Sequence, residues 1–256
     1  MGCRIHAIVL LLLVGCASPY PFPMPAMPAI EARVAALLPA DAILLGEQHD
    51  APTHQGMHRR VIEVLGARGA LAGVAIEMAE QGRSTAGLPR EAAEADVRIA
   101  LQWSDTGWPW QAYAPAVMAA VRAGVPVIGA NLPRSQMRNA MVDAALDASV
   151  PNDVLQAQRS AVREGHCGLL PDTQIGPMTR VQIARDRAMA QAIAQAAVPG
   201  KTVVLLAGAG HVDATLGVPR HLPPALRVRA ELLPAEPPKK DYCAELREQL
   251  KGKPTP

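Results

Sequence analysis

The chain has 256 residues, of which half are hydrophobic and 19% are charged, so it is long enough to fold around a sizeable core and is not a disordered chain. Its formal net charge of +2 is too small to favour nucleic acid as a partner. Only 3% of the residues are aromatic, which makes their positions in the sequence informative.

Residues 1–15 have the pattern of a secretory signal peptide. Arg4 precedes an apolar run from Ala7 to Val14 that is too short for a stable transmembrane helix. The sequence "LVGC" then resembles the bacterial lipoprotein box, which implies cleavage before Cys16 and acylation (palmitate) at this residue. The alternative is an ordinary signal peptide with a cysteine that occurs there by chance. Since Ala17 is not a known retention signal, we expect a lipid-anchored protein of the bacterial cell envelope, on the outer membrane and facing the periplasm.

A proline-rich segment at residues 16–29 follows the signal peptide. Five prolines between residues 17 and 30 disfavour both a helix and an inner strand, so we expect a semi-extended spacer. The globular domain is expected at residues 30–235. Residues 236–256 are expected to form a C-terminal tail with one short helix near residues 241–251.

The domain alternates short apolar runs with helical patterns, which predicts an α/β fold with a mostly parallel central sheet flanked by helices. The predicted strands are 42–46, 73–78, 125–131, 202–208 and 226–232, and the last alternates as an edge strand does. The predicted helices are 53–68, 90–102, 110–123, 134–147, 152–164 and 175–197. Because no strand pattern occurs between residues 134 and 197, we expect a smaller helical insertion there.

Polar residues follow four of the predicted strands, where open parallel sheets bind their ligands. Glu47 and His49 end the first strand, and the later strand ends supply Glu77, Asn131 with Arg134, and His211. Glu47, His49, His211 and Glu77 are ligand types that suit a divalent metal such as zinc or manganese. The alternative is that the histidines are hydrogen-bonded in a polar core without metal. In "GAGHVD" an Asp stands where the dinucleotide fingerprint needs a small residue, which argues against nucleotide binding.

Two cysteines remain in the expected domain and tail. Cys167 and Cys243 form one even pair in an oxidising compartment, which favours a disulfide that would tie the tail to the body. Two unpaired thiols are the alternative, because the sequence does not supply the distance between them.

All aromatic residues of the expected domain lie in the segment "WSDTGWPWQAY". A flat macrocycle such as haem needs aromatic or apolar walls and an oxygen or nitrogen ligand for its iron, which Trp110 and Tyr113 are suited to provide. One alternative is a local core around a helix that begins after Pro109. Another is that the tryptophans pack in the core while Tyr113 alone faces a ligand.

The predicted insertion contributes two further candidates. His166 lies just after a predicted helix, between two glycines that make its backbone adaptable. Arg185 lies on a predicted helix, where it is suited to pair with a carboxylate such as a haem propionate or to remain a surface charge.

Seven motifs in order along the chain resemble those of the ChaN-like haem-binding lipoproteins, which share a superfamily with Tiki, TraB and erythromycin-esterase-like proteins. The motifs are "LLGEQHD", "AIEM", "WPWQAY", "VPVIGANLPR", "HCGLLP", "QIARDRAMA" and "LLAGAGHV". The resemblance implies an α/β body, a role in iron or haem acquisition, iron held by a tyrosine, a histidine near the propionates, and homodimer formation on haem binding. The candidate cofactor-binding residues are therefore Tyr113, His166, Arg185, Trp110, Asn131 and Arg134. More distant relatives use the positions of Glu47, His49 and His211 for a metal or for hydrolysis.

Three functions remain open from the sequence. The first is a haem-binding lipoprotein, the second a metal-dependent hydrolase that uses Glu47, His49 and His211, and the third a non-catalytic scaffold lipoprotein. Because the chain has neither a nucleophile elbow nor a complete triad pattern, a binding protein is favoured over an enzyme.

Overall fold

The structure, a computed structural model, describes residues 26–251 of the chain. The predicted signal peptide, Cys16 and most of the spacer lie outside these residues, so acylation stays a prediction. Within the described part, no helix combines the length and the apolar character needed to cross a membrane.

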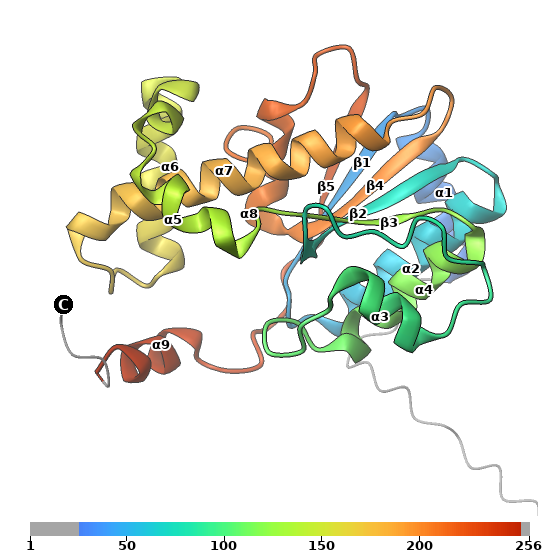
Figure 1. Cartoon of the computed structure of the whole chain (residues 1–256), viewed down its shortest axis with the longest axis horizontal. Helices are drawn as coiled ribbons and strands as arrows, with labels where there is room; N and C mark the ends of the chain where they lie inside the picture. Colours follow the sequence, from blue (N-terminus) through green and yellow to red (C-terminus); the bar gives the residue numbers. More distant parts are fainter. Residues whose placement is uncertain (1–25, 252–256) are drawn as a thin grey trace, which may run out of the picture.

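A five-stranded sheet lies at the centre of the molecule (Figure 1). Its strands are β1 (Ala42–Glu47), β2 (Leu71–Glu80), β3 (Val127–Asn131), β4 (Thr202–Gly208) and β5 (Val228–Leu232), in the order β3-β2-β4-β1-β5. All neighbouring strands are parallel, so their carboxyl ends share one edge. This confirms the predicted α/β class, and β5 is the edge strand that its alternation indicated.

Helices cover both faces of the sheet (Figure 1). One face packs against α1 (Met27–Leu37), α2 (Pro52–Ala67), α3 (Glu94–Leu101) and α4 (Trp110–Ala123), and the other mainly against α7 (Asp172–Ala196). In β1, Ile43 and Leu45 enter the first of these cores, whereas Ala42 and Leu44 enter the second. A strand buried on both faces must be apolar throughout, which explains the continuous apolar runs in the sequence.

The predicted insertion lies between β3 and β4, and its helices are α5 (Arg134–Val142), the 3₁₀ helix η1 (Ala144–Ser149), α6 (Asn152–Gly165) and α7. A separate small core that includes Leu146, Val154 and Val181 holds these helices together. The single helix expected over 134–147 is divided at Asp143, whose side chain accepts a hydrogen bond from the Ala145 amide and starts η1. Two short elements, α8 (Ala209–Val212) and η2 (Val218–His221), follow β4.

Helix α1 differs from the sequence prediction, because it begins at Met27 inside the expected spacer. Pro28 occupies its first turn, where the missing amide proton costs no intrahelical hydrogen bond. Ile30 and Val34 are fully buried in the core. The last residues of the proline-rich segment are therefore part of the folded domain.

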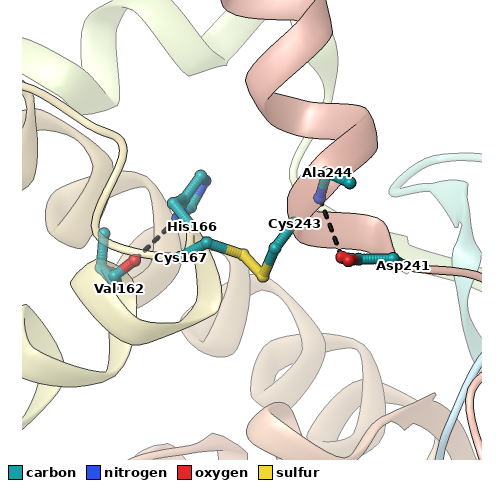
Figure 2. Close-up of a disulfide and its surroundings, with 6 residues drawn as sticks. All are labelled: Val162, His166, Cys167, Asp241, Cys243 and Ala244. Atoms are coloured by element: carbon teal, nitrogen blue, oxygen red, sulfur yellow. Dashed lines mark hydrogen bonds between the residues drawn. A yellow bond between two sulfur atoms is a disulfide. The ribbon is translucent and has the colours of Figure 1, made fainter.

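The chain after β5 leads to α9 (Tyr242–Lys251), which matches the short helix expected in the tail. A disulfide joins Cys167, just after α6, to Cys243 at the start of α9, with 5.7 Å between their Cα atoms (Figure 2). The predicted disulfide is confirmed, and the alternative of two free thiols is wrong.

Candidate functional site

A pocket of about 1350 Å³ lies at the carboxyl ends of the strands, and we call it the strand-end pocket. Its volume exceeds the range of roughly 300–1,000 Å³ that is usual for small-molecule sites. It is enclosed by the loop after β1, the first turns of α2, the start of α4 with the loop before it, one side of α7, the short helix α8, and the segment after β5. Its lining includes Glu47, His49, Arg59, Glu77, Trp108, Tyr113, Arg185, His211, Leu233, Lys239, Lys240 and Tyr242.

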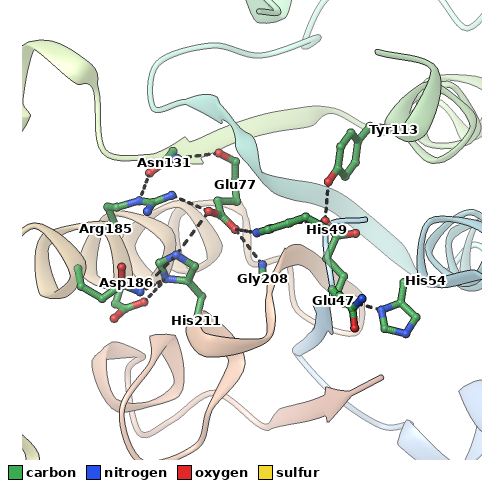
Figure 3. A network of polar contacts seen from close by, with 12 residues as sticks. Glu47, His49, His54, Glu77, Tyr113, Asn131, Arg185, Asp186, Gly208 and His211 are labelled. Carbon is green, nitrogen blue, oxygen red and sulfur yellow. Dashed lines mark hydrogen bonds and ion pairs between the residues drawn. The ribbon is translucent and has the colours of Figure 1, made fainter. Parts of the chain in front are cut away.

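Glu77 of β2 is the centre of a charged network on the floor of the pocket (Figure 3). Its carboxylate accepts hydrogen bonds from Arg185 Nη2 at 2.5 Å and from the Gly208 amide at 2.8 Å, and His211 Nε2 lies 3.5 Å away. Arg185 Nε also donates to Asn131 Oδ1 at 2.9 Å. Burial alone would raise the pKa of Glu77, but the positive charges of His211, His49 and Arg185 outweigh burial and keep that pKa well below its usual range.

His211 lies between two buried carboxylates. Its Nδ1 is 2.5 Å from Asp186 Oδ1, on the side of the ring that faces away from Glu77. Burial lowers the pKa of His211, but Glu77 and Asp186 act more strongly and raise that pKa to about 9. His211 is therefore an imidazolium at neutral pH, and it neutralises part of the negative charge on the floor.

Glu47 organises the other half of the floor. Its Oε1 accepts a hydrogen bond from the Tyr113 hydroxyl at 2.6 Å and lies 2.7 Å from His49 Nδ1. Burial and the charge of Glu47 raise the pKa of Tyr113 above its usual range. The His49 side chain is 41% exposed and lies at the pocket surface. Burial opposes its protonation, but the hydrogen bond to Glu47 and the charge of Glu77 outweigh burial and raise the pKa of His49.

Alternate residues of the "EQHD" motif point to two different partners. Glu47 and His49 belong to the floor, whereas Gln48 and Asp50 bind the tail: Gln48 Oε1 accepts from the Glu236 amide at 3.1 Å, and Asp50 Oδ2 accepts from the Lys239 amide and the Tyr242 hydroxyl at 2.8 Å each. The sequence analysis missed the role of Gln48 and Asp50. The signal was their alternation with Glu47 and His49, which places them on the opposite side of the chain.

Two histidines of α2 were also missed. His54 Nδ1 accepts from the Gln48 amide at 2.9 Å, and its Nε2 lies 2.9 Å from the Pro234 carbonyl oxygen. His58 is fully buried with its Nδ1 3.4 Å from Glu47 Oε2, and burial lowers its pKa to about 4. Both lie on the buried side of a helix that the sequence indicated only as amphipathic.

The aromatic segment divides between the core and the pocket. Trp108 lines the pocket and packs edge-to-face on His49, with 4.7 Å between ring centroids. Trp110 is buried in the core, where its Nε1 donates to Glu94 at 2.8 Å and its ring contacts Trp103. Of the two predicted cofactor contacts in this segment, the structure brings Tyr113 to the pocket and not Trp110.

Three other predicted cofactor contacts, Arg134, Asn131 and His166, do not line the strand-end pocket. Arg134 is at the start of α5 near Glu80, and together with Asn131 it lines a smaller neighbouring pocket of about 380 Å³. His166 follows α6, beside the disulfide, with Nδ1 2.7 Å from the Val162 carbonyl oxygen (Figure 2).

The predicted metal ligands Glu47, His49, Glu77 and His211 do come together at the floor. However, among residues 26–251 no group of three or more His, Cys, Asp and Glu side chains is arranged to hold a metal ion. Both histidines are instead paired with carboxylates. The arrangement is a charge-balanced hydrogen-bond network, and the metal stays a prediction.

Comparison with known proteins bears on the same region. The family model described as "Haem-binding uptake, Tiki superfamily, ChaN" matches residues 33–222. A solved structure titled "Cofacial heme binding to ChaN of Campylobacter jejuni" is similar in fold, with a TM-score of 0.64 and 24% sequence identity over 77% of this chain and 83% of that chain. No curated protein matches the chain.

Proposed function

The chain belongs to the ChaN family of haem-binding uptake proteins in the Tiki superfamily, and from this premise we propose that it binds haem in the strand-end pocket. The observation that supports this site is its lining. Apolar and aromatic groups such as Trp108, Pro109 and Leu233 share one cavity with phenol oxygens and cationic side chains. A porphyrin needs this combination of flat apolar walls, an axial oxygen or nitrogen ligand, and partners for its carboxylates.

Tyr113 is the iron ligand that the sequence predicts, and the structure sets a condition on it. Its side chain is 2% exposed and its hydroxyl donates to Glu47. To bind iron as a phenolate, Tyr113 has to lose the proton that its hydroxyl now donates to Glu47 Oε1. Tyr242 offers a second phenol at the same pocket, and it is 45% exposed.

Titration of the purified mature protein with ferric haem tests the proposal. We expect saturable binding and a high-spin ferric visible spectrum with a phenolate charge-transfer band. Tyr113→Phe should abolish that band while far-UV circular dichroism stays unchanged, and Tyr242→Phe should keep it. The reverse outcome assigns the iron to Tyr242. A parent protein without saturable binding would overturn the proposed function.

We further propose that the protein is a lipoprotein anchored through Cys16 and acts in haem or iron acquisition at the outer membrane. The lipoprotein motif that ends at Cys16 supports the anchor. Acyl chains on this residue would hold the protein at the membrane, since each buried methylene contributes roughly 0.8 kcal/mol to membrane binding. Cys16→Ser should move the protein from the membrane fraction to the soluble fraction. Light scattering with and without haem tests the expected homodimer.

A hydrolase is the second candidate, and the His49–Glu47 pair favours it. An imidazole that is partly exposed in a pocket and oriented by a buried carboxylate is a usual arrangement for a general base. Elemental analysis of untagged protein should show close to one metal equivalent if this hydrolase is metal-dependent, and His211→Ala should reduce it. If haem binding, metal and ester hydrolysis are all absent, the scaffold lipoprotein becomes the favoured function.

A further inference from the structure

The tail forms one side of the strand-end pocket, although it lies beyond the family match, which ends at residue 222. Five residues after β5 line the cavity, namely Leu233 and Ala235 at the end of the domain and Lys239, Lys240 and Tyr242 of the tail. We call residues 233–243 the tail wall. Because the rest of the lining comes from the domain, the tail wall is the part of the site that this chain adds to the matched region.

The tail wall is attached at both of its ends. At the first, Pro234 and Glu236 are hydrogen-bonded to His54 and Gln48 of the domain. At the second, Cys243 is bonded covalently to Cys167 of the insertion (Figure 2). Helix α9, which follows, has no buried residue. Apolar packing therefore does not hold this end, which is held by the disulfide and by the hydrogen bonds that Asp50 accepts from the Lys239 amide and the Tyr242 hydroxyl.

The tail wall also supplies cations to the rim of the pocket. Within residues 26–251, no carboxylate oxygen lies within 4.0 Å of the Lys239 ammonium. The Lys240 ammonium lies 2.5 Å from a carboxylate oxygen of the solvent-exposed Glu245 and over the Tyr242 ring. By contrast, Arg185 is engaged by both Glu77 and Asn131. The cation that is most available to a ligand carboxylate is therefore on the tail and not on the floor.

We propose that the tail wall determines ligand specificity: Lys239 and Lys240 bind the carboxylates of a planar dicarboxylate ligand, and the Cys167–Cys243 bridge keeps them in place. This inference rests on the proposed haem function and names the groups that recognise the propionates. The sequence favoured Arg185 and His166 for that role. Arg185 already donates to Glu77 and Asn131, and His166 does not line the strand-end pocket.

Ferric haem and its dimethyl ester separate charge recognition from recognition of the ring. Lys239→Ala/Lys240→Ala should weaken haem binding by about tenfold and leave ester binding unchanged, because only haem has carboxylates to lose a partner. Lys201→Ala/Lys251→Ala removes the same two charges elsewhere and should leave the affinities for both ligands unchanged. If the parent binds neither ligand, the proposed function fails. If the parent binds haem and the tail variant binds it equally well, this inference alone fails.

The bridge is tested in the same assay. A dithiol reduces it by supplying two electrons and two protons, which gives two cysteine thiols and oxidises the dithiol to a disulfide. After the thiols are alkylated and the reductant is removed, haem affinity should fall by about as much as in the lysine variant. The preference for haem over the ester should fall with it. Cys167→Ser/Cys243→Ser should behave in the same way and show no response to the dithiol. If the reduced protein has an unchanged circular dichroism spectrum and still prefers haem over the ester, the bridge does not position the tail wall.

Discussion

The floor and the tail wall of the strand-end pocket are built by different means. On the floor, Glu77, His211 and Glu47 are buried at or near strand ends, and each has a charged or hydrogen-bonding partner from another element. The tail wall leads into a helix with no buried residue and depends on a few hydrogen bonds and one covalent bond. The floor is thus held by the packing of the sheet against α4 and α7, whereas the position of the wall depends on the oxidation of two cysteines.

The two regions meet in one motif. Glu47 and His49 contribute to the floor, and Gln48 and Asp50 receive the tail. A change at Gln48 or Asp50 should therefore affect the wall without disturbing the charges below it. The predictions that follow separate these two contributions through stability, from the largest expected effect to the smallest.

Glu77→Gln should destabilise the protein most. The substitution keeps the shape of the side chain but removes the charge that compensates Arg185 and His211 in a buried site. Removal of one partner from a buried ion pair typically costs about 3–5 kcal/mol, because the remaining charge is left without compensation. Urea unfolding followed by circular dichroism measures this loss.

Glu80→Gln is the matched control, because it makes the same change in the same strand. Glu80 is partly exposed, and its carboxylate lies 4.0 Å from the exposed Arg134 guanidinium. A pair of this kind contributes at most about 1 kcal/mol, so the unfolding free energy should hardly change. Equal losses in the two variants would show that the buried network is not what stabilises the floor.

The pH dependence of stability should show the imidazolium of the floor. The pKa of His211 is raised to about 9 in the folded protein by Glu77 and Asp186, above the ordinary value of 6.5 for a histidine, so its stabilising contribution is complete below pH 6.5 and is lost between pH 6.5 and 9. The difference in pKa corresponds to about 3 kcal/mol. The raised pKa of His49 adds a loss of the same sign.

Urea unfolding at several pH values from 6 to 10 measures this loss. His211→Gln should give a flatter curve, even if the variant is less stable at every pH. On the acid side the sign is reversed for His58. Burial lowers its pKa to about 4, so its contribution is present above pH 6.5 and is lost as the pH falls to 4. A curve for His211→Gln that falls as steeply as that of the parent would contradict the assignment of the charge to His211.

The floor was largely predictable from the sequence, and the tail wall was not. Continuous apolar runs indicate parallel strands, and the polar residues that follow such strands must meet at one edge, so Glu47, Glu77 and His211 could be placed together. The tail has no such periodicity. The sequence predicted the disulfide that ties the tail to the body, but not that Lys239 and Tyr242 would bind Asp50 in the loop after β1.

The aromatic segment shows why the sequence alone did not predict which side chains face the pocket and which face the core. Pro109 precedes helix α4, which leaves Trp108 in the loop that faces the pocket and places Trp110 in the first turn, against the core. The sequence showed that Trp108 and Trp110 flank a helix start but not which face of that helix is buried. In the same way, the buried side of α2 determines that His58 approaches Glu47. These outcomes depend on packing between elements and not on the local pattern.

The smallest expected effects come from one substitution made in both regions. Tyr113→Phe and Tyr242→Phe each remove a hydroxyl that donates to a carboxylate, at 2.6 Å to Glu47 and at 2.8 Å to Asp50. In the buried floor the loss should be about 1.5–2 kcal/mol, because Glu47 is out of contact with water and nothing replaces the donor. At the tail wall water replaces it, so the loss should be below about 0.5 kcal/mol. Urea unfolding of both variants, each without haem, gives the two values. Equal losses in the free energy of unfolding would mean that the tail wall is as firmly packed as the floor. Reduction of the disulfide would then not be expected to displace the wall.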